Sequence, residues 1–488
     1  MQKEIYDLTN PQKSIWLTEQ FYQGSCVNNL CGTVAIDDVV NFDILKKSIY
    51  QFVKDNDSFR LKLSYDENGE IKQEIVDFEP FEIELVDVKN EDELVLLENE
   101  MVDIPFSILN SYLHHFKMYR LPSGKGGFVL VAHHLICDAC TAGLVASKTI
   151  NIYTSLLKGE EITEATTSYI NYINSENDYL VSNKFEKDKE YWNGIFETIP
   201  EIGNIPSIKQ ENKNTCKAER KTFVLPKEQV EKINDFCSCN KISAFNFFMA
   251  LYAIYIGRVS GLDDFVLGTP ILNRSTFVEK TTPGMFISTV PFRFNITNGL
   301  SFIDFTKKIA SDSLGIFRHQ KYPYQNILED IRKKNPAQPN LYDILISYQN
   351  TRTNRNNVEV PYEVRWTFNH NLADSMQIHL FDMNDEGLLN ISYDYRLDKY
   401  SEDDILAIHE RICFMMEQVL ASDNLLIENM DIVTPKERDV ILNEFNDTFK
   451  PYSFSNSIIK MIENTAKEYP DNIAIETYNS SIHIQNFY

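Results

Sequence analysis

The sequence has few of the residues that mark several large classes of protein. Its 488 residues include only 8 Cys, which are too few and too scattered for the disulfide framework of a small secreted domain. Scattered thiols are typical of a reducing cytosol, so we expect a cytoplasmic protein. No stretch approaches the ~20 apolar residues of a membrane span, and Met1–Asp7 lacks the pattern of a signal peptide.

Basic residues are also scarce. The chain has 47 Lys and Arg against 71 Asp and Glu, which gives a formal net charge of −24. Affinity for nucleic acid depends on clustered Lys and Arg, so this balance argues against a nucleic-acid partner. Short-period repeats are absent as well, which excludes a solenoid.

The composition supplies ample material for hydrophobic cores. Hydrophobic residues make up 43% of the chain, with 31 Phe and 25 Tyr. The length fits two or three domains of ~100–200 residues each. Strand and helix patterns alternate irregularly as far as about residue 430, which predicts a mixed α/β architecture. A charged and polar stretch within 174–190 is where we place the boundary between two lobes.

Local signals predict several elements. The first helix is expected near Asn10-Pro11, with Asn10 as its N-cap and Pro11 at its first position. Phe245–Ile256 is apolar enough for a buried helix, and Gly261–Pro270 has the pattern of a turn, a strand and a second turn.

His133-His134 and Asp138 form the most informative cluster. The apolar run Phe128–Ala132 predicts a strand before the doublet, and a helical pattern follows Asp138 until Gly159. The doublet therefore lies at a strand-to-helix corner, where free backbone N–H groups favour developing negative charge. A base beside a fixed anion suits acyl transfer to an amine or hydroxyl, because the nucleophile loses a proton as it attacks.

Other readings of these residues are weaker. His114-His115 lies in a predicted strand with no carboxylate behind it, and we interpret that doublet as structural. Cys137 and Cys140 form a CxxC beside the histidines, but a zinc site needs a second pair at suitable spacing, and Cys237-Ser238-Cys239 does not supply one. We therefore expect no metal site.

Several separated motifs, in order, resemble the condensation domains of non-ribosomal peptide synthetases. His133–Asp138 matches the HHxxxDG motif of that family except that Ala139 replaces its glycine. The other matching segments are Leu8–Trp16, Asp55–Arg60, Gly261–Arg274, Gly284–Pro291, Arg318–Tyr324 and Asp343–Gln349.

The resemblance implies a fold of two chloramphenicol-acetyltransferase-like lobes in a V-shaped pseudo-dimer. We assign 1–180 to the N-terminal lobe and 181–434 to the C-terminal lobe. The implied reaction is amide formation between an acyl thioester donor and the amine of an aminoacyl-carrier-protein thioester. The domain itself would bind no cofactor, since phosphopantetheine is carried by partner proteins and coenzyme A by the donor.

The resemblance also assigns roles to residues. His134 is expected to accept or orient the proton of the attacking amine, while His133 packs inward and shapes the turn. Asp138 should pair with Arg274 and tie the two lobes together. Backbone N–H groups near Ala139 are expected to stabilise the oxyanion, and Ala can replace Gly there if its φ is negative. No Ser or Cys nucleophile is needed, because the thioester is already activated.

Past residue 435 the chain resembles a linker and the truncated start of an adenylation domain. The segment that carries this resemblance is Tyr469–Ile475.

The opening helix and Arg318–Tyr324 resemble starter domains, which take a fatty acyl group from coenzyme A. Only seven residues precede Leu8, which we also take to favour a starter over an elongation domain with a carrier-bound donor. A non-catalytic recruitment domain is a third reading, but such relatives usually lose the second His. An epimerisation domain would follow an adenylation domain rather than precede one.

Overall fold

The computed structural model describes most of the chain and divides it into two compact units, Met1–Ile432 and Val433–Tyr488. The described residues are 4–162, 166–207, 215–349, 359–382, 387–422, 424–451, 457–478 and 480–484.

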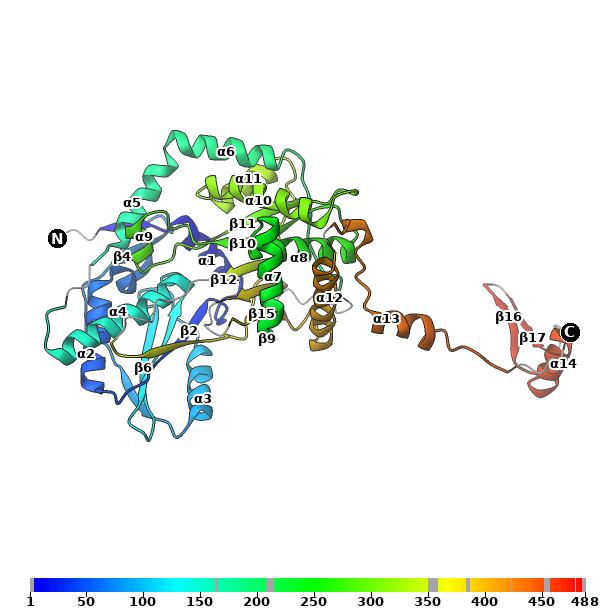
Figure 1. Cartoon of the computed structure of the whole chain (residues 1–488), viewed down its shortest axis with the longest axis horizontal. Coiled ribbons are helices and arrows are strands. Elements are labelled where there is room, and N and C mark those ends of the chain that lie inside the picture. Colours follow the sequence, from blue (N-terminus) through cyan, green and yellow to red (C-terminus); the bar gives the residue numbers. More distant parts are fainter. Residues whose placement is uncertain are drawn as a thin grey trace. The chain divides into compact units, whose positions relative to one another are not determined.

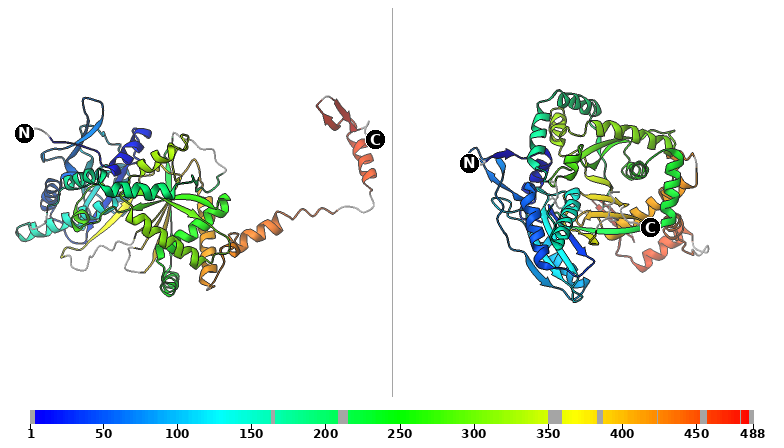
Figure 2. Two further views of the ribbon diagram at one scale, coloured as in Figure 1. Left: turned by 90° about the horizontal axis from the view of Figure 1, so that it is seen from above. Right: turned by 60° about the vertical axis from the view of Figure 1, so that its left-hand side comes forward.

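A five-stranded sheet organises the first half of the larger unit, with strands in the order β13-β2-β7-β6-β5 (Figures 1 and 2). Helices α2 and α4 contact each other on one face of this sheet, and α3 contacts strands β2, β7 and β13 on the other. The bounds are β2 (Asn29–Ile36), β5 (Glu84–Asp87), β6 (His114–Arg120), β7 (Gly126–His133), β13 (Tyr362–Thr367), α2 (Phe42–Asp55), α3 (Glu91–Val102) and α4 (Ala139–Lys158).

A larger mixed sheet organises the second half, in the order β11-β10-β12-β14-β15-β9 with β8 paired to β10. Helix α8 packs against α7, α10 and α12 in the core beside this sheet. The strands are β8 (Glu201–Ile202), β9 (Ala218–Leu225), β10 (Asp264–Ile271), β11 (Ser288–Asn295), β12 (Ile344–Gln349), β14 (Met376–Phe381) and β15 (Leu389–Arg396). The helices are α7 (Lys227–Asn240), α8 (Ala244–Ser260), α10 (Phe302–Arg318), α11 (Tyr324–Arg332), α12 (Glu402–Leu420) and η3 (Ile427–Asn429).

Smaller elements complete the two units. In the larger unit these are a sheet of β1 (Ile5–Asp7), β4 (Ile71–Ile75) and β3 (Leu61–Tyr65), with α1 (Asn10–Phe21), η1 (Asp57–Arg60), α5 (Tyr169–Leu180), α6 (Asn183–Ile195) and α9 (Phe277–Thr281). The smaller unit contains α13 (Pro435–Asp439), η4 (Val440–Glu444), α14 (Ile458–Glu468), β16 (Ile473–Thr477) and β17 (Ser480–His483).

Two hydrophobic cores lie one in each half of the larger unit. Buried residues up to Ile173 belong to the first core, and those from Trp192 onward belong to the second, apart from Phe286 and Tyr362, which pack into the first. The polar stretch in which we placed the lobe boundary is helical and forms α5 and α6. The mixed α/β architecture expected from the sequence is confirmed.

One strand does not follow the predicted division at residue 180. Strand β13 belongs to the second half by sequence, yet it pairs antiparallel with β2 at the edge of the first sheet. A strand of the first sheet is therefore supplied from within 181–434, a long-range pairing that local sequence patterns do not reveal.

The start of the first helix differs by one residue from the expectation. Thr9 is the N-cap of α1, because its side chain accepts from the Gln12 amide while the Gln12 side chain accepts from the Thr9 amide. Asn10 is the first helical residue, and Pro11 follows it within the first turn, where its missing N–H costs nothing.

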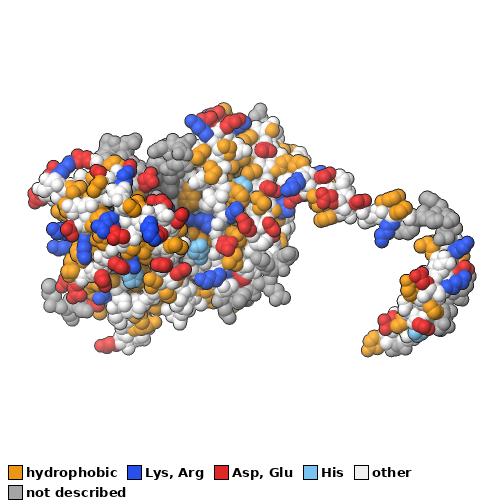
Figure 3. All heavy atoms as spheres, turned by 90° about the horizontal axis from the view of Figure 1, so that it is seen from below, with side chains coloured by type: hydrophobic (Ala, Val, Ile, Leu, Met, Phe, Trp, Pro, Cys, Tyr) orange, Lys and Arg blue, Asp and Glu red, His pale blue; other side chains and the backbone are white. Residues whose placement is uncertain are grey.

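Charge and hydropathy in the structure agree with the composition. Acidic and basic side chains are interspersed on the face drawn in Figure 3. Within the described residues no single helix is long and apolar enough to cross a membrane, although the bent pair α7 and α8 meets that criterion when counted together. Nearly the whole of α8 is buried in the second core.

Candidate active site

The predicted strand-to-helix corner is present. Strand β7 ends at His133, and α4 begins at Ala139 with Asp138 as its N-cap. The Asp138 side chain accepts a hydrogen bond from the Thr141 amide at 2.7 Å. At the other end of α4 Gly159 adopts a left-handed conformation with φ 70°, which favours glycine. The residues between His133 and Ala139 therefore form a short turn fixed at both ends.

His133 is buried and held on both ring nitrogens. Its Nδ1 accepts from the Leu135 amide at 3.1 Å, which places the proton on Nε2. Nε2 lies 3.3 Å from the Glu19 carboxylate. Burial lowers the pKa of His133, and Glu19 offsets part of this effect. With both nitrogens engaged, His133 faces inward and holds the turn.

Helix α1 contacts the turn between His133 and Ala139. These contacts were not expected from the sequence. Gln12 Nε2 donates to the Leu135 carbonyl at 3.0 Å, and Glu19 also accepts from Asn28 Nδ2 at 2.8 Å. Asn28 in turn accepts the His134 amide through its carbonyl at 2.8 Å. Gln12 and Glu19 are both buried and stand seven residues apart, so they share one helix face. The turn residues that they contact lie more than one hundred positions further along the chain, so no local pattern identified them.

His134 is half-buried, and it is the histidine of the pair that can reach a substrate. Burial lowers its pKa, while the nearby Asp138 carboxylate raises it by a smaller amount. Backbone carbonyls of His134 and Cys137 also raise the pKa, although neither has hydrogen-bond geometry to Nδ1. Nδ1 is the enclosed ring nitrogen, which leaves Nε2 as the one open to a substrate. A lowered pKa keeps the ring neutral, which a proton acceptor requires.

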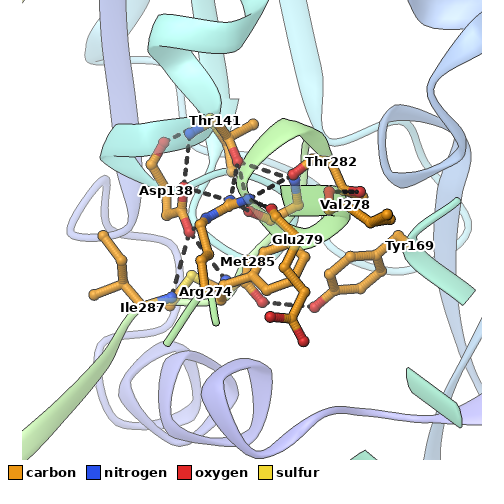
Figure 4. A network of polar contacts seen from close by, with 12 residues as sticks. Asp138, Thr141, Tyr169, Arg274, Val278, Glu279, Thr282, Met285 and Ile287 are labelled. Carbon is orange, nitrogen blue, oxygen red and sulfur yellow. Dashed lines mark hydrogen bonds and ion pairs between the residues drawn. The ribbon is translucent and has the colours of Figure 1, made fainter. Parts of the chain in front are cut away.

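Asp138 and Arg274 are fully buried and form the expected ion pair (Figure 4). Arg274 Nη2 lies 3.1 Å from each carboxylate oxygen of Asp138. Asp138 Oδ2 also accepts from the amides of Phe286 and Ile287, at 3.0 and 3.3 Å. A buried carboxylate needs such partners, because an uncompensated charge in the interior is costly.

The segment from Arg274 to Phe286 surrounds the ion pair of Asp138 and Arg274. Arg274 Nη1 donates to the carbonyls of Glu279 and Thr282 at 2.5 and 2.6 Å, and the guanidinium lies 3.8 Å from the centre of the Phe286 ring. Thr141 of α4 exchanges hydrogen bonds with Gly284 at 2.6 and 2.9 Å. Residues from both halves of the chain therefore fix the start of α4.

Ala139 occupies the position where the family motif has glycine. It is the first residue of α4, it is exposed, and its φ is not positive, so no glycine is required. Thr141 N is capped by Asp138, and Ala142 N bonds to the Asp138 carbonyl. The amides of Ala139 and Cys140 remain without a partner inside the helix, as the first N–H groups of any helix do.

The neighbouring cysteines are unsuited to nucleophilic catalysis. Burial raises the pKa of Cys137 well above its usual value and also raises that of Cys140, so both remain thiols. Within the described part of the chain no group of three or more His, Cys, Asp or Glu side chains could hold a metal ion. The second doublet, His114-His115, lies within strand β6. His114 is buried among aromatic rings, and burial lowers its pKa to about 3, whereas His115 is exposed.

Comparison with known families shows the family to which the chain belongs. A model of the condensation domain matches residues 2–442. The chain belongs to the condensation-domain family. Condensation domains catalyse amide bond formation in non-ribosomal peptide synthetases, so the chain is an acyltransferase-type enzyme.

Curated relatives are large synthetase proteins. The chain is 30% identical over 482 residues to surfactin synthase subunit 1 of Bacillus subtilis (strain 168), covering 97% of this chain and 13% of that protein. It is 24% identical over 484 residues to a dimodular nonribosomal peptide synthase of the same strain, covering 96% and 20%. The chain thus spans no more than a fifth of the length of either relative.

Solved structures share the fold. The starter condensation domain of rhizomide synthetase in complex with C8-CoA has a TM-score of 0.76 at 19% identity, covering 88% of this chain and 97% of that one. The first condensation domain of the calcium-dependent antibiotic synthetase in complex with a substrate analogue has a TM-score of 0.76 at 17% identity, covering 88% and 99%.

The buried ion pair yields a stability prediction. Arg274→Ala leaves the Asp138 carboxylate buried without its cation and should lower the free energy of unfolding by ~3–5 kcal/mol. Arg120→Ala is the matched control, because Arg120 forms an exposed pair with Asp87 that should contribute little to stability. Denaturant titration of both variants measures the difference. Equal losses in the two variants would contradict a structural role for the buried pair.

Proposed function

We propose that this domain joins the acyl group of an acyl-coenzyme A thioester to the α-amine of an amino acid carried on the phosphopantetheine arm of a carrier protein. The observation that carries the proposal is the half-buried His134, whose pKa is lowered by burial, on the turn that leads to the free amides at the start of α4, in a chain of the condensation-domain family. The donor class is supported by the fold shared with a starter domain solved with C8-CoA, and by the similarity to surfactin synthase subunit 1.

In the proposed reaction the amine nitrogen attacks the thioester carbonyl carbon while His134 Nε2 accepts a proton from the amine. The carbonyl oxygen becomes an oxyanion, which the amides of Ala139 and Cys140 can stabilise together with the positive end of the α4 dipole. Collapse of this intermediate forms the amide bond and expels the coenzyme A thiolate, which takes up the proton. No covalent enzyme intermediate is required, in agreement with the raised pKa of Cys137 and Cys140.

Other residues position these groups. Asp138 and Arg274 hold the start of α4, and His133 with Glu19 holds the turn that presents His134. Coenzyme A and phosphopantetheine enter as parts of the substrates, so the domain needs no resident cofactor in this proposal.

The chain's immediate partners are part of the same proposal. We assign 435–488 to a linker and the start of an adenylation domain in the same polypeptide, with a downstream carrier protein as acceptor. Similarity to surfactin synthase subunit 1 covers 97% of the chain, although the family model ends at residue 442. Helix α14 and strand β16 expose Ile458, Ile459 and Ile473, which supports packing against further structure. A cytoplasmic location, expected from the scattered cysteines, belongs to this proposal as well.

An elongation domain that takes a carrier-bound donor is the second candidate. The structural likeness to the first condensation domain of the calcium-dependent antibiotic synthetase, solved with a substrate analogue, does not distinguish this donor from an acyl-coenzyme A thioester. A non-catalytic recruitment role is the weakest reading, because His134 is present and accessible.

Removal of the base tests the role of His134. His134→Ala should lower the rate of amide formation by ~10²–10⁴-fold at saturating substrates, the range expected for a general base. His115→Ala removes an exposed histidine from the other doublet and should leave the rate near that of the wild type. A His134→Ala variant as active as His115→Ala would exclude the proposed base.

Direct titration tests the protonation state of His134. Because its pKa is lowered, the ring should remain neutral as the pH falls through ~6.5, the value of an unperturbed histidine, and should gain its proton only below it. NMR of protein labelled at histidine ring carbons, with the signal assigned from His134→Gln, measures the midpoint. A midpoint at or above that value would contradict the burial argument.

The donor class is tested by supplying two donors side by side. The domain with its own carrier protein, loaded with the amino acid, should yield an acylated amino acid from an acyl-coenzyme A thioester, detected by the mass of the carrier. Condensation only with an aminoacyl or peptidyl group on a second carrier would establish the elongation reading and reject the starter reading.

A further inference from the structure

The loop between α1 and β2 holds the backbone of His134. The Asn28 carbonyl, in this loop, accepts the His134 amide at 2.8 Å. The Asn28 side chain donates to Glu19, which lies beside His133. Asn28 is buried, and the loop that carries it is a series of turns rather than a helix or strand. The backbone of His134 is therefore fixed only as firmly as this loop is.

A side chain from the second half of the chain binds the carbonyls of this loop. Asn369 Nδ2 donates to the carbonyls of Cys26 and Val27 at 3.0 and 3.1 Å, and to that of Asn29 at 2.9 Å. These three carbonyls lie on both sides of Asn28 in the sequence. Asn369 is itself buried. Since buried polar groups without partners are costly, the amide of Asn369 holds the loop on both sides of Asn28.

Asn369 is fixed in turn by contacts within the second half. It follows β13, and its Oδ1 accepts from the Asn371 amide at 3.0 Å. The intervening residue, His370, has φ 55°, a left-handed conformation that residues other than glycine adopt infrequently. The Ala218 amide, at the start of β9, donates to the His370 carbonyl at 3.0 Å. Asn369 is thus held rigidly where the chain passes from the first sheet to the second.

Both polar contacts of Asn28 lead to the catalytic doublet. Its carbonyl bonds to the backbone of His134, and its side chain reaches His133 through Glu19. A shift of the loop would therefore move both histidines together. The ion pair of Asp138 and Arg274 holds the other end of the turn, so the second half fixes each end through a different residue.

We propose that Asn369 is a positioning residue for amide formation, which acts through Asn28 on His134. This inference rests on the proposed role of His134 as the base and is independent of the class of the donor. A displacement of ~1 Å at a reacting group is enough to lower a rate by about 100-fold, so a loop that holds the base controls the rate without contacting substrate. Only a side chain with two N–H donors at this length can bind all three carbonyls.

The first test measures kcat and KM of Asn369→Ala. The assay uses octanoyl-coenzyme A, or the carrier-bound donor if the wild type accepts only that, with the intact chain and its loaded carrier protein. The kcat should fall by about 10- to 100-fold. KM for both substrates should stay near the wild-type value, because the buried side chain acts on the base and not on binding.

Asn246→Ala is the matched control. Asn246 is also in the second half, has the same 9% exposure as Asn369, and accepts from Ser313 in the core beside α8. Its removal should lower stability without lowering kcat. A loss of kcat in Asn246→Ala equal to that in Asn369→Ala would reduce the effect to general destabilisation and overturn the inference.

The second test asks whether Asn369 acts through His134. In a His134→Ala background Asn369→Ala should cause no further loss of kcat, because the base that Asn369 positions is gone. Histidine-ring NMR of Asn369→Ala should also give a His134 midpoint closer to ~6.5 than in the wild type, since a looser turn admits water to the ring. A purely structural role predicts the same fractional loss in both backgrounds and an unchanged midpoint.

Failure of this inference can be distinguished from failure of the proposed function. If His134→Ala lowers the rate but Asn369→Ala leaves kcat unchanged, or lowers it by the same factor in both backgrounds, this inference alone is overturned. If His134→Ala is as active as the wild type, the proposed base fails, and the inference fails with it. Should Asn369→Ala not fold, Asn369→Ser, which keeps one donor, is measured in both backgrounds by the same criteria, and an unchanged kcat would again overturn the inference.

Discussion

The buried pair of Asp138 and Arg274 is the interaction on which the active site depends. Taking a carboxylate and a guanidinium out of water is costly, and the mutual attraction of the pair, with hydrogen bonds to both carboxylate oxygens and from both terminal nitrogens of Arg274, offsets that cost. Its partners come from the start of α4 in the first half and from the loop after β10 in the second. The cost of leaving either charge alone therefore holds the two halves together at the turn where, in our proposal, the reacting groups meet.

The rest of the site depends on this ion pair and on the pairing of strand β13 with β2. With the first turn of α4 fixed, Ala139 and Cys140 present their free amides. Helix α1 contacts His133 and Leu135 on either side of His134, and Asn28 accepts the His134 amide. Like the segment that carries Arg274, strand β13 comes from the second half of the chain and contacts the first half, where it forms the edge of the first sheet. Residues from both halves thus fix the turn. In our proposal both substrates are placed against one base, and residues from the two halves support this placement.

The strand-to-helix corner could be anticipated from local hydropathy, whereas the inward His133 and the pairing of Asp138 with Arg274 were implied by the family resemblance. The cap at Thr9 was missed since a reciprocal capping box competes with the Asn10-Pro11 signal. Glu19 and β13 could not be predicted, because their partners lie more than one hundred residues away. Ala139 was left open by the sequence, and the helical backbone there explains why glycine is dispensable. The assigned catalytic roles themselves stay predictions.

The measurement that tests the central claim most directly is a double-mutant cycle between Asp138 and Arg274. Asp138→Asn, Arg274→Met and the double variant would be compared for the free energy of unfolding and for the rate of amide formation. If the pair holds the catalytic turn, the double variant should be no worse than either single one, with a coupling energy of ~3 kcal/mol. Strictly additive losses in stability and in rate would show that the two residues act independently, and would contradict the account.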